Sequence, residues 1–491
     1  MSEILQCPAL VVTAPLIGAC LVAIAGWVRR SLCFPLAMAS LLTAGLAALK
    51  LAWDVLVLGP ISYHLGGWPP PWGIAYEVDG LNAVVLVMVA WAAVVNLVAA
   101  RAWVGRMPEH KRGAFYALYV LSATGLMGIV VTGDLFNLYV LLEIASLSGY
   151  ALVAMGDERA PLVSLNYVFL GTVGACFYLL GVGFIYIMTG SLNMADVARL
   201  LVGLRNSPVI WVAFCVIIAG VWLKAAFFPL HAWLPRAYSH APIPAAGLLA
   251  PTMTKVMIYV MIRLMTGVFG VGWVMGVMGG AEVVVWMAVV AMIVGAIMAL
   301  RGRTLRQVAT WLIVSEVAYM VGGAWVGNRL AMTGAVLHLI NDCAMTLCVM
   351  LAIGGLAWAL GGEELGRLEG AFAKAPWSMG ALVGAALAMI GVPPTCGFFS
   401  KWYLLLGGMA AGRWEFVVGL VVSSLLNIIV FFRLFERALF TGESHHAPAM
   451  AEAPVAVVAP AVGVALGLVV LGLYNGWIVT HFIEPLWLGR L

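Results

Sequence analysis

Long apolar stretches alternate with short polar segments along the whole chain, and this pattern predicts membrane-spanning helices. Each stretch holds about 20 largely apolar residues, the length at which an α-helix crosses the hydrocarbon core of a bilayer. We expect about fourteen spans, near residues 8–28, 33–52, 81–100, 114–132, 135–155, 162–188, 208–230, 244–266, 272–300, 307–327, 331–358, 377–407, 415–436 and 453–477. The predicted fold class is an all-α integral membrane protein.

Little of the chain remains outside these spans. The stretch 53–80 is rich in Gly, Pro and Trp but too short for a domain, and 191–206 has the apolar spacing of a short amphipathic surface helix. Composition supports the membrane assignment, because 64% of the 491 residues are hydrophobic and only 9% are charged. We therefore expect no catalytic domain outside the membrane.

Charge and cysteine content exclude several classes of function. The net charge of +4 is small and spread over short clusters, which argues against nucleic acid as a partner. The eight cysteines include no CxxC motif and lie mostly inside apolar stretches. We predict no metal site, no disulfide framework, no iron–sulfur cluster and no other cofactor.

The basic residues predict the orientation of the spans. Most of the 25 lysines and arginines fall in loops that follow odd-numbered spans. Because cytoplasmic loops of membrane proteins carry the excess of basic residues, these loops should lie inside. We expect a multi-pass protein of the cell (inner) membrane with both termini on the outer face.

The fifth and seventh spans each carry an ionisable residue in an apolar setting. Glu143 follows Asp134 by nine residues, which places it about 13 Å along a helix that begins there. Burying Lys224 in hydrocarbon costs about 2.5 kcal/mol or more, which marks it as functional unless its side chain snorkels to the headgroups. Glu143 and Lys224 could form a fixed salt bridge or a pair whose proton affinity changes with its separation. We favour the switchable pair.

A proline interrupts the seventh span. Pro229 lies between Lys224 and His231, and the seven-residue spacing predicts that the lysine and the histidine share one face of a helix. Backbone freed by a proline within a membrane is tolerated only where it faces protein or a water-filled cavity. We expect Lys224, the break and His231 to mark one side of a hydrated path, although His231 alone could equally be an interface residue.

A second break is expected in the twelfth span, where Pro393 and Pro394 precede Lys401. Lysine and proline occur in opposite order in the seventh and twelfth spans, which run in opposite directions, and this indicates two inverted five-helix repeats with broken helices seven and twelve. The predicted units are N-terminal helices 1–3 (residues 1–110), helices 4–8 (111–267), helices 9–13 (268–440) and helix 14 (441–491).

Four more ionisable residues lie within the spans between the two breaks. These are Lys255 in span eight, Glu316 in span ten, and His338 and Asp342 in span eleven. His338, Asp342 and Thr346 are spaced by four residues and therefore share one helix face. Ionisable groups inside membrane spans typically mark ion pathways. We predict a relay of proton-exchanging groups along the membrane midplane, from Glu143 to Lys401.

The motifs around these residues resemble those of one family. The matching stretches are GDLFNLYVLLE (133–143), FPLHAWLPRAYSHAP (228–242), TKVMIY (254–259), HLIND (338–342) and GVPPTCGFFSKW (391–402). The chain resembles the antiporter-like subunits of respiratory complex I, membrane-bound hydrogenases and Mrp-type cation/proton antiporters. Stretch 63–84 is most similar to the D-type Mrp protein and its hydrogenase-associated relatives.

The resemblance implies roles for individual residues. It implies that Glu143 and Lys224 form a coupled pair and that Lys255, His338 and Lys401 continue the path. Many family members carry HxxxK in span eleven, but the matching positions here are Asp342 and Thr346. The usual lysine is absent, and a continuous relay would need His338, Asp342 and water to bridge Lys255 and Lys401.

Three functions remain open at this point. Our leading hypothesis is a proton-translocating, Mrp D-like antiporter subunit of a multisubunit membrane complex, with or without exchange of protons for sodium. The first alternative is the proton-pumping arm of a redox complex such as a membrane-bound hydrogenase, a formate- or CO-linked enzyme or NADH:quinone oxidoreductase. The chain has no cofactor motif, so redox chemistry would belong to partner subunits. The second alternative is a non-conducting scaffold subunit.

Overall fold

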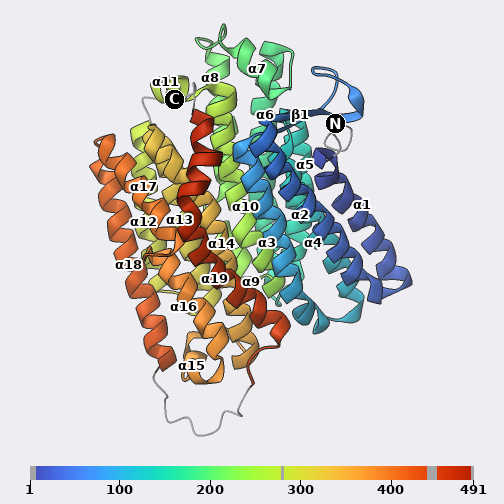
Figure 1. Ribbon diagram of the computed structural model, residues 1–491, viewed down its shortest axis with the longest axis vertical. Coiled ribbons are helices and arrows are strands. Elements are labelled where there is room, and N and C mark those ends of the chain that lie inside the picture. Colours follow the sequence, from blue (N-terminus) through green and yellow to red (C-terminus); the bar gives the residue numbers. More distant parts are fainter. Residues whose placement is uncertain (1–6, 278–280, 440–450, 488–491) are drawn as a thin grey trace.

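The computed structural model describes residues 7–277, 281–439 and 451–487, which form an elongated bundle of long helices (Figure 1). The helices are α1 (Cys7–Val28), α2 (Cys33–Leu58), α3 (Gly80–Gly105), α4 (Glu109–Val131), α5 (Leu135–Ala154), α6 (Ala160–Thr189), α7 (Met194–Leu201), α8 (Pro208–Ala225), α9 (Trp233–His240), α10 (Ile243–Arg263), α11 (Val271–Val277), α12 (Ala281–Leu300), α13 (Leu305–Val326), α14 (Arg329–Leu360), α15 (Ala371–Lys374), α16 (Pro376–Ile390), α17 (Cys396–Ala410), α18 (Trp414–Leu439) and α19 (Val455–Ile478). Short π-helical turns continue α10 over Leu264–Phe269 and α19 over Val479–Ile483.

The number of membrane crossings agrees with the sequence pattern. Within the described ranges, 13 helices are long and apolar enough to cross a membrane. Helices α16 and α17 have 15 residues each, too few for a full crossing, and together they occupy the predicted twelfth span. The prediction of an all-helical membrane protein is confirmed.

Both ends of the described chain lie at one end of the bundle. Figure 1 places the start of α1 and the end of α19 at the same end of the bundle, which agrees with an even number of crossings. Residues 1–6 and 488–491 lie outside the described ranges, as does the predicted unit boundary at 440–441. The outer location of the termini stays a prediction.

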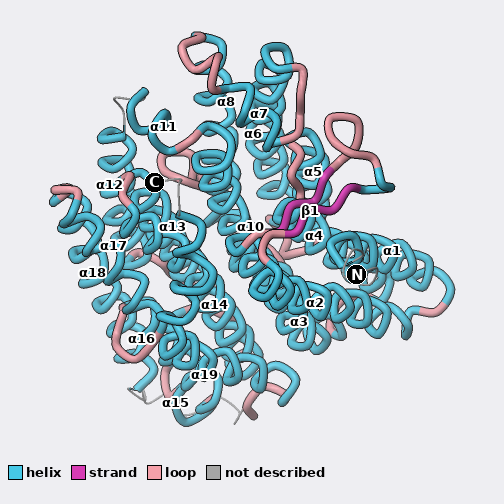
Figure 2. Tube along the Cα trace, turned by 45° about the horizontal axis from the view of Figure 1, so that its top comes forward, coloured by secondary structure: helices cyan, strands magenta, loops and turns pink. Residues whose placement is uncertain are grey.

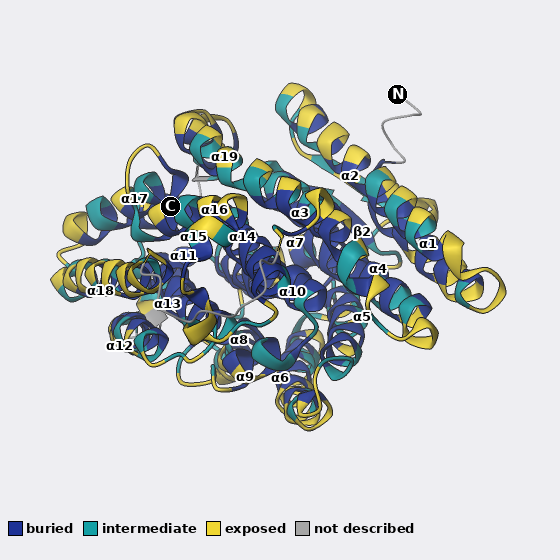
Figure 3. Cartoon of the chain, turned by 90° about the horizontal axis from the view of Figure 1, so that it is seen from below, coloured by how far each residue is buried: buried dark blue, intermediate teal, exposed yellow. Residues whose placement is uncertain are grey.

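Three helices form the centre of the bundle. Nearly every residue of α10, α13 and α14 is buried, whereas α1, α6, α18 and α19 expose large apolar side chains (Figure 3). Exposed apolar residues on the periphery are suited to contact with lipid, and the buried central helices are shielded from it. The central helices are therefore the part of the fold in which polar groups can be held away from the bilayer.

The segment between α2 and α3 folds differently from expectation. Strands β1 (Ile61–His64) and β2 (Ala75–Val78) pair in an antiparallel hairpin with Ile61 opposite Val78, where the sequence predicted only a loop (Figure 2). These strands are too short to give a clear alternating pattern among the surrounding glycines and prolines. The predicted amphipathic segment does form a helix, α7, whose apolar residues Met194, Val197 and Leu201 are buried.

The helices that carry Lys224 and Lys401 are both interrupted. Helix α8 ends at Ala225, Ala226 adopts a left-handed conformation with φ of 56°, and α9 begins only at Trp233. The prediction that His231 shares a helix face with Lys224 is therefore wrong, because the residues between them are not helical. Helix α16 ends at Ile390 and α17 begins at Cys396. Both interruptions contain the prolines noted in the sequence.

Candidate functional site

The first buried ion pair joins α5 to the end of α8. Lys224 is 1% exposed, and its Nζ lies 3.9 Å from Oε1 of Glu143, as the sequence led us to expect. The ammonium donates hydrogen bonds to Ser146 Oγ at 2.7 Å and to Tyr150 OH at 3.0 Å. Ser146 and Tyr150 follow Glu143 by three and seven residues on α5, so all three present one helix face to the lysine. Their helical spacing was a signal that the sequence analysis missed.

The break after α8 is held by aromatic side chains. Trp233 Nε1 donates a hydrogen bond to the carbonyl of Leu223, one residue before Lys224, at 2.9 Å. His231 is half-buried, stacks on Phe228 and meets the ring of Trp311 edge-on. It makes no hydrogen bond or ion pair with the other predicted path residues within the described part of the chain. The geometry places His231 at the rim of the break rather than beside Lys224.

A second ion pair lies wholly inside the protein, between α10 and α14. Lys255 Nζ is 2.8 Å from Oδ2 of Asp342, and both side chains are 0% exposed. Lys255 also donates to the carbonyl of Ala250 at 3.2 Å and to Thr346 Oγ1 at 3.3 Å. Thr346 in turn donates to Oδ1 of Asp342 at 3.1 Å. The threonine therefore supports both members of the pair.

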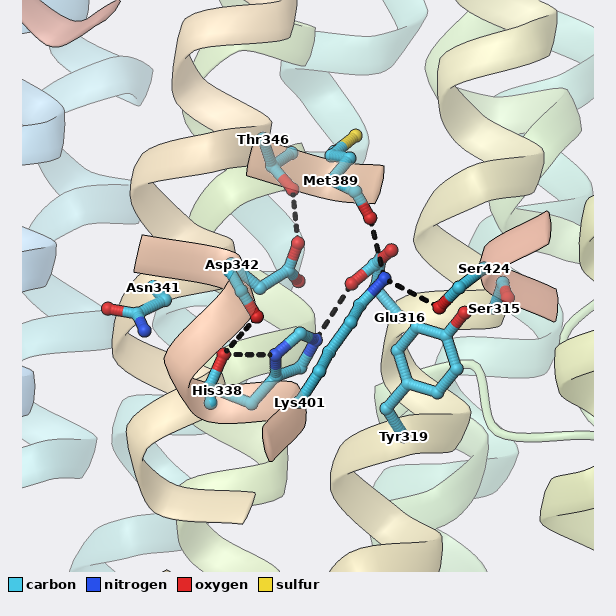
Figure 4. Close-up of polar contacts among 12 residues, drawn as sticks. Ser315, Glu316, Tyr319, His338, Asn341, Asp342, Thr346, Met389, Lys401 and Ser424 are labelled. Carbon is cyan, nitrogen blue, oxygen red and sulfur yellow. Dashed lines mark hydrogen bonds and ion pairs between the residues drawn. The ribbon is translucent and has the colours of Figure 1, made fainter. Parts of the chain in front are cut away.

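The next group connects α13, α14 and α17. His338 Nε2 is 2.7 Å from Oε2 of Glu316, and its Nδ1 is 2.9 Å from Ser400 Oγ. Figure 4 shows Glu316 and His338 facing each other, with Asp342 one turn further along α14. The other carboxylate oxygen of Glu316, Oε1, has no hydrogen-bond partner among the described residues. A histidine between a carboxylate and a hydroxyl can accept a proton on one nitrogen and release it from the other.

Lys401 ends the series at the second break. Its Nζ donates to the carbonyl of Met389 at 2.6 Å and to Ser424 Oγ at 3.3 Å, and it lies 4.8 Å from the ring centre of Tyr319. Figure 4 shows the lysine running beside Tyr319 toward Met389. Gly391, with φ of 93°, lies where an added Cβ would come within 3.3 Å of Lys401 Cδ. The break therefore supplies both a carbonyl acceptor and the space for the lysine.

These groups form a file that is balanced in charge. The file contains Glu143, Lys224, Lys255, Asp342, Glu316, His338 and Lys401, which supply three carboxylates, three ammonium groups and one imidazole. A buried charge is tolerated when an opposite charge and hydrogen bonds compensate for its lost hydration. Within the described ranges, the file consists of the Glu143–Lys224 pair, the Lys255–Asp342 pair, the Glu316–His338 pair and Lys401. No direct hydrogen bond or ion pair among the described residues joins one of these four to another. Passage of a proton between groups would require water or side-chain movement.

Thr346→Val tests whether the threonine hydroxyl stabilises the Lys255–Asp342 pair. Valine removes both hydrogen bonds of the threonine but leaves Lys255 and Asp342 in place. We expect the free energy of unfolding to fall by about 2 kcal/mol, because each of the two lost hydrogen bonds contributes about 1 kcal/mol. Thermal unfolding in detergent measures this, with Thr346→Ser as the control that keeps the hydroxyl. Equal destabilisation by serine and valine would contradict the assignment.

Sequence and structure comparisons find similar proteins. Residues 132–427 match a family model described as NADH:quinone oxidoreductase/Mrp antiporter, transmembrane. The N subunit of NADH-quinone oxidoreductase from Desulforudis audaxviator is 43% identical, over 97% of this chain and 97% of the relative. The D-type protein of the Na(+)/H(+) antiporter from Alkalihalophilus pseudofirmus is 29% identical, over 82% of this chain and 80% of the relative. A chain of the membrane-bound sulfane sulfur reductase, an archaeal respiratory membrane complex, has a TM-score of 0.89 and 29% identity, over 97% of this chain and 96% of that chain.

Proposed function

Because the chain belongs to the NADH:quinone oxidoreductase/Mrp antiporter transmembrane family, we propose that it is a proton-translocating, antiporter-like subunit of a multisubunit membrane complex. The observation that carries this proposal is the charge-balanced file of buried acid–base groups across α5, α8, α10, α13, α14 and α17. Holding so many ionisable groups inside a bundle is costly, and such groups in membrane proteins usually serve ion transfer.

The proposed mechanism starts at the first pair. The distance of 3.9 Å between Lys224 and Glu143 is longer than a direct hydrogen bond, so a movement of α5 toward α8 that brings them into contact would strengthen their interaction. Such a change alters how firmly the pair holds its proton and drives exchange with the Lys255–Asp342 pair. The imidazole of His338 then passes the proton toward Lys401 through water. In this scheme the predicted units 111–267 and 268–440 act as the two repeats.

The driving partner is either a redox module or an ion gradient. Identity of 43% along nearly the whole chain to a protein of the quinone oxidoreductase supports the redox-driven alternative. The D-type antiporter protein matches less of the chain at 29% identity, and it supports cation/proton exchange, with sodium as the counter-ion. Both alternatives use the same file. Because the identity to the quinone oxidoreductase protein is higher, we propose the redox-driven arm first and the Mrp D-like role second.

Lys224→Met in the assembled complex tests the shared proposal. The complex is purified in mild detergent from its native membrane, reconstituted into vesicles, and proton uptake is followed with a pH-sensitive dye while an electron donor or a sodium gradient is supplied. We expect proton uptake to fall by about a hundredfold, as for loss of a proton-transferring group. The control is Lys111→Met, which removes an exposed lysine near the start of α4. Normal uptake by the Lys224 variant would leave only the scaffold function.

Mass spectrometry of the same preparation separates the two driving partners. Iron–sulfur, flavin or nickel proteins among the bound subunits are expected for a redox-driven arm. Small hydrophobic subunits together with a larger antiporter-like chain, and no redox protein, would instead favour cation/proton exchange.

A further inference from the structure

Helix α18 carries polar residues on a buried face in the middle of an otherwise apolar helix. Residues at helical spacing form this face, among them Ser423, Asn427, Val430 and Leu434, and all four are buried. Ser423 and Asn427 are 0% exposed, which is unusual for polar side chains on a helix at the edge of the bundle. The sequence motifs do not include them.

One end of this polar face reaches Lys401. Ser424 Oγ accepts the hydrogen bond from Lys401 Nζ at 3.3 Å. Its neighbour Ser423 forms hydrogen bonds with the hydroxyls of Tyr319 and Ser315, the second at 3.0 Å. Because Tyr319 lies under the ammonium of Lys401, α18 contributes to the surroundings of the last lysine of the file.

Asn427 lies one turn beyond Ser423 and Ser424 and has unsatisfied hydrogen-bonding groups. Neither its amide nitrogen nor its carbonyl oxygen has a hydrogen-bond partner among the described residues. Buried polar groups in proteins are almost always satisfied, and those without a protein partner are commonly satisfied by buried water. Asn427 therefore marks a position suited to hold water, one helical turn from Ser424, which contacts Lys401.

The next turn of α18 opens to one end of the bundle. Val430 lines a crevice of about 30 Å³ together with Leu300, Val308 and Arg433. A cavity of about 10–15 Å³ is enough for one water molecule, so the crevice has room for water. From Asn427 to Arg433 the rise along the helix is about 9 Å. The crevice lies where α12 ends and α13 begins, on the side that the basic residues predict to be inside.

Building on the proposed function, we infer that Asn427 and the polar face of α18 form a water-holding site through which Lys401 exchanges protons with this end of the bundle. Ser423, Asn427 and Val430 are buried at successive turns of α18, so they form a single row on one helix face, and Ser424 lies next to Ser423 at its start. Asn427 acts as a positioning residue, because it holds the water and does not itself change protonation state.

Asn427→Leu and Asn427→Ser test the site in the reconstituted complex. Leucine fills the position with apolar atoms, and we expect proton uptake to fall about tenfold, the equivalent of one lost hydrogen-bonded step. Serine keeps a polar group and space for water, and uptake should remain within about twofold of the parent. The melting temperature of the leucine variant should not fall, because removing a buried amide without partners costs no protein hydrogen bond. A purely structural role predicts instead that leucine lowers the melting temperature and that serine does not restore uptake, and that result would overturn the inference.

Val430→Phe tests the route to the crevice. A larger side chain at position 430 should block the passage of protons between Asn427 and the crevice at Arg433. Proton uptake should then fall as strongly as in Asn427→Leu. The matched control is Val418→Phe, since Val418 is 58% exposed on the outer face of the same helix. Normal uptake in both the Val430 and Asn427→Leu variants, with uptake lost in Lys224→Met, would overturn this inference and leave the proposed function intact. Normal uptake in all three would overturn the proposed function itself.

Discussion

Lys255→Met is expected to lower the free energy of unfolding by about 3–5 kcal/mol, because it leaves the carboxylate of Asp342 buried without its counter-charge. Both side chains are 0% exposed, so water cannot replace the lost partner directly. Denaturant or thermal unfolding of the purified complex measures the loss. The matched control is Arg367→Met, which breaks an ion pair of the same type with Glu364 at 2.7 Å on the exposed surface. That change should cost less than about 1 kcal/mol.

The double variant Lys255→Met with Asp342→Leu separates stability from transport. Replacing both charges with apolar groups removes the uncompensated carboxylate, so most of the lost stability should return. Proton uptake should not return, because the second pair of the file is missing. A double variant as unstable as Lys255→Met would contradict the assignment of Asp342 as the partner of Lys255.

Glu143→Gln should have a different profile, with a large effect on transport and a smaller effect on stability than Lys255→Met. Lys224 keeps its hydrogen bonds to Ser146 and Tyr150, and Glu143 is 24% exposed at a distance of 3.9 Å. We expect proton uptake to fall by about a hundredfold, because the neutral amide can no longer change the charge state of the pair. The free energy of unfolding should fall by less than in Lys255→Met, because Glu143 is partly exposed and Lys224 keeps two hydrogen bonds.

The control for Glu143→Gln is Glu109→Gln, which neutralises an exposed carboxylate paired with Arg30 at the start of α4. It should leave both uptake and stability unchanged. Uptake that survives Glu143→Gln at the parent rate would show that the pair is a fixed salt bridge between helices.

The crossings and the first ion pair could be predicted from the sequence because each follows from local physics. An apolar stretch long enough to cross a bilayer has few alternatives to a helix, and a carboxylate and a lysine at depth each need a partner. For Glu143, the nearest lysine inside a predicted span is Lys224. Their contact at 3.9 Å matches that reasoning.

The other partners depend on how helices are rotated against each other, which a single sequence does not specify. Asp342 shares a helix face with His338, yet it contacts Lys255 on α10, while His338 contacts Glu316 on α13. Ser424 and Asn427 escaped notice because small polar residues inside an apolar helix do not differ from ordinary packing positions. The misplacement of His231 has a different cause, since helical spacing was applied across a break.

The threonine at position 346 has a structural explanation. Many members of the family that the chain resembles carry a lysine there, which in this chain would bring a second ammonium next to Asp342. With threonine, Lys255 alone supplies the positive charge, and the hydroxyl bonds to both members of the pair. The Lys255–Asp342 pair is therefore complete without a lysine at position 346.

In the proposed mechanism Lys224 and Lys401 belong to one path, and this is tested by proton uptake in Lys224→Met, Lys401→Met and the double variant. Groups that act in series are strongly non-additive, because one interruption already stops the flow. We predict that each single change lowers uptake of the reconstituted complex by about a hundredfold and that the double change adds nothing. Partial losses in the single variants that multiply in the double variant would mean two independent routes and would contradict the claim.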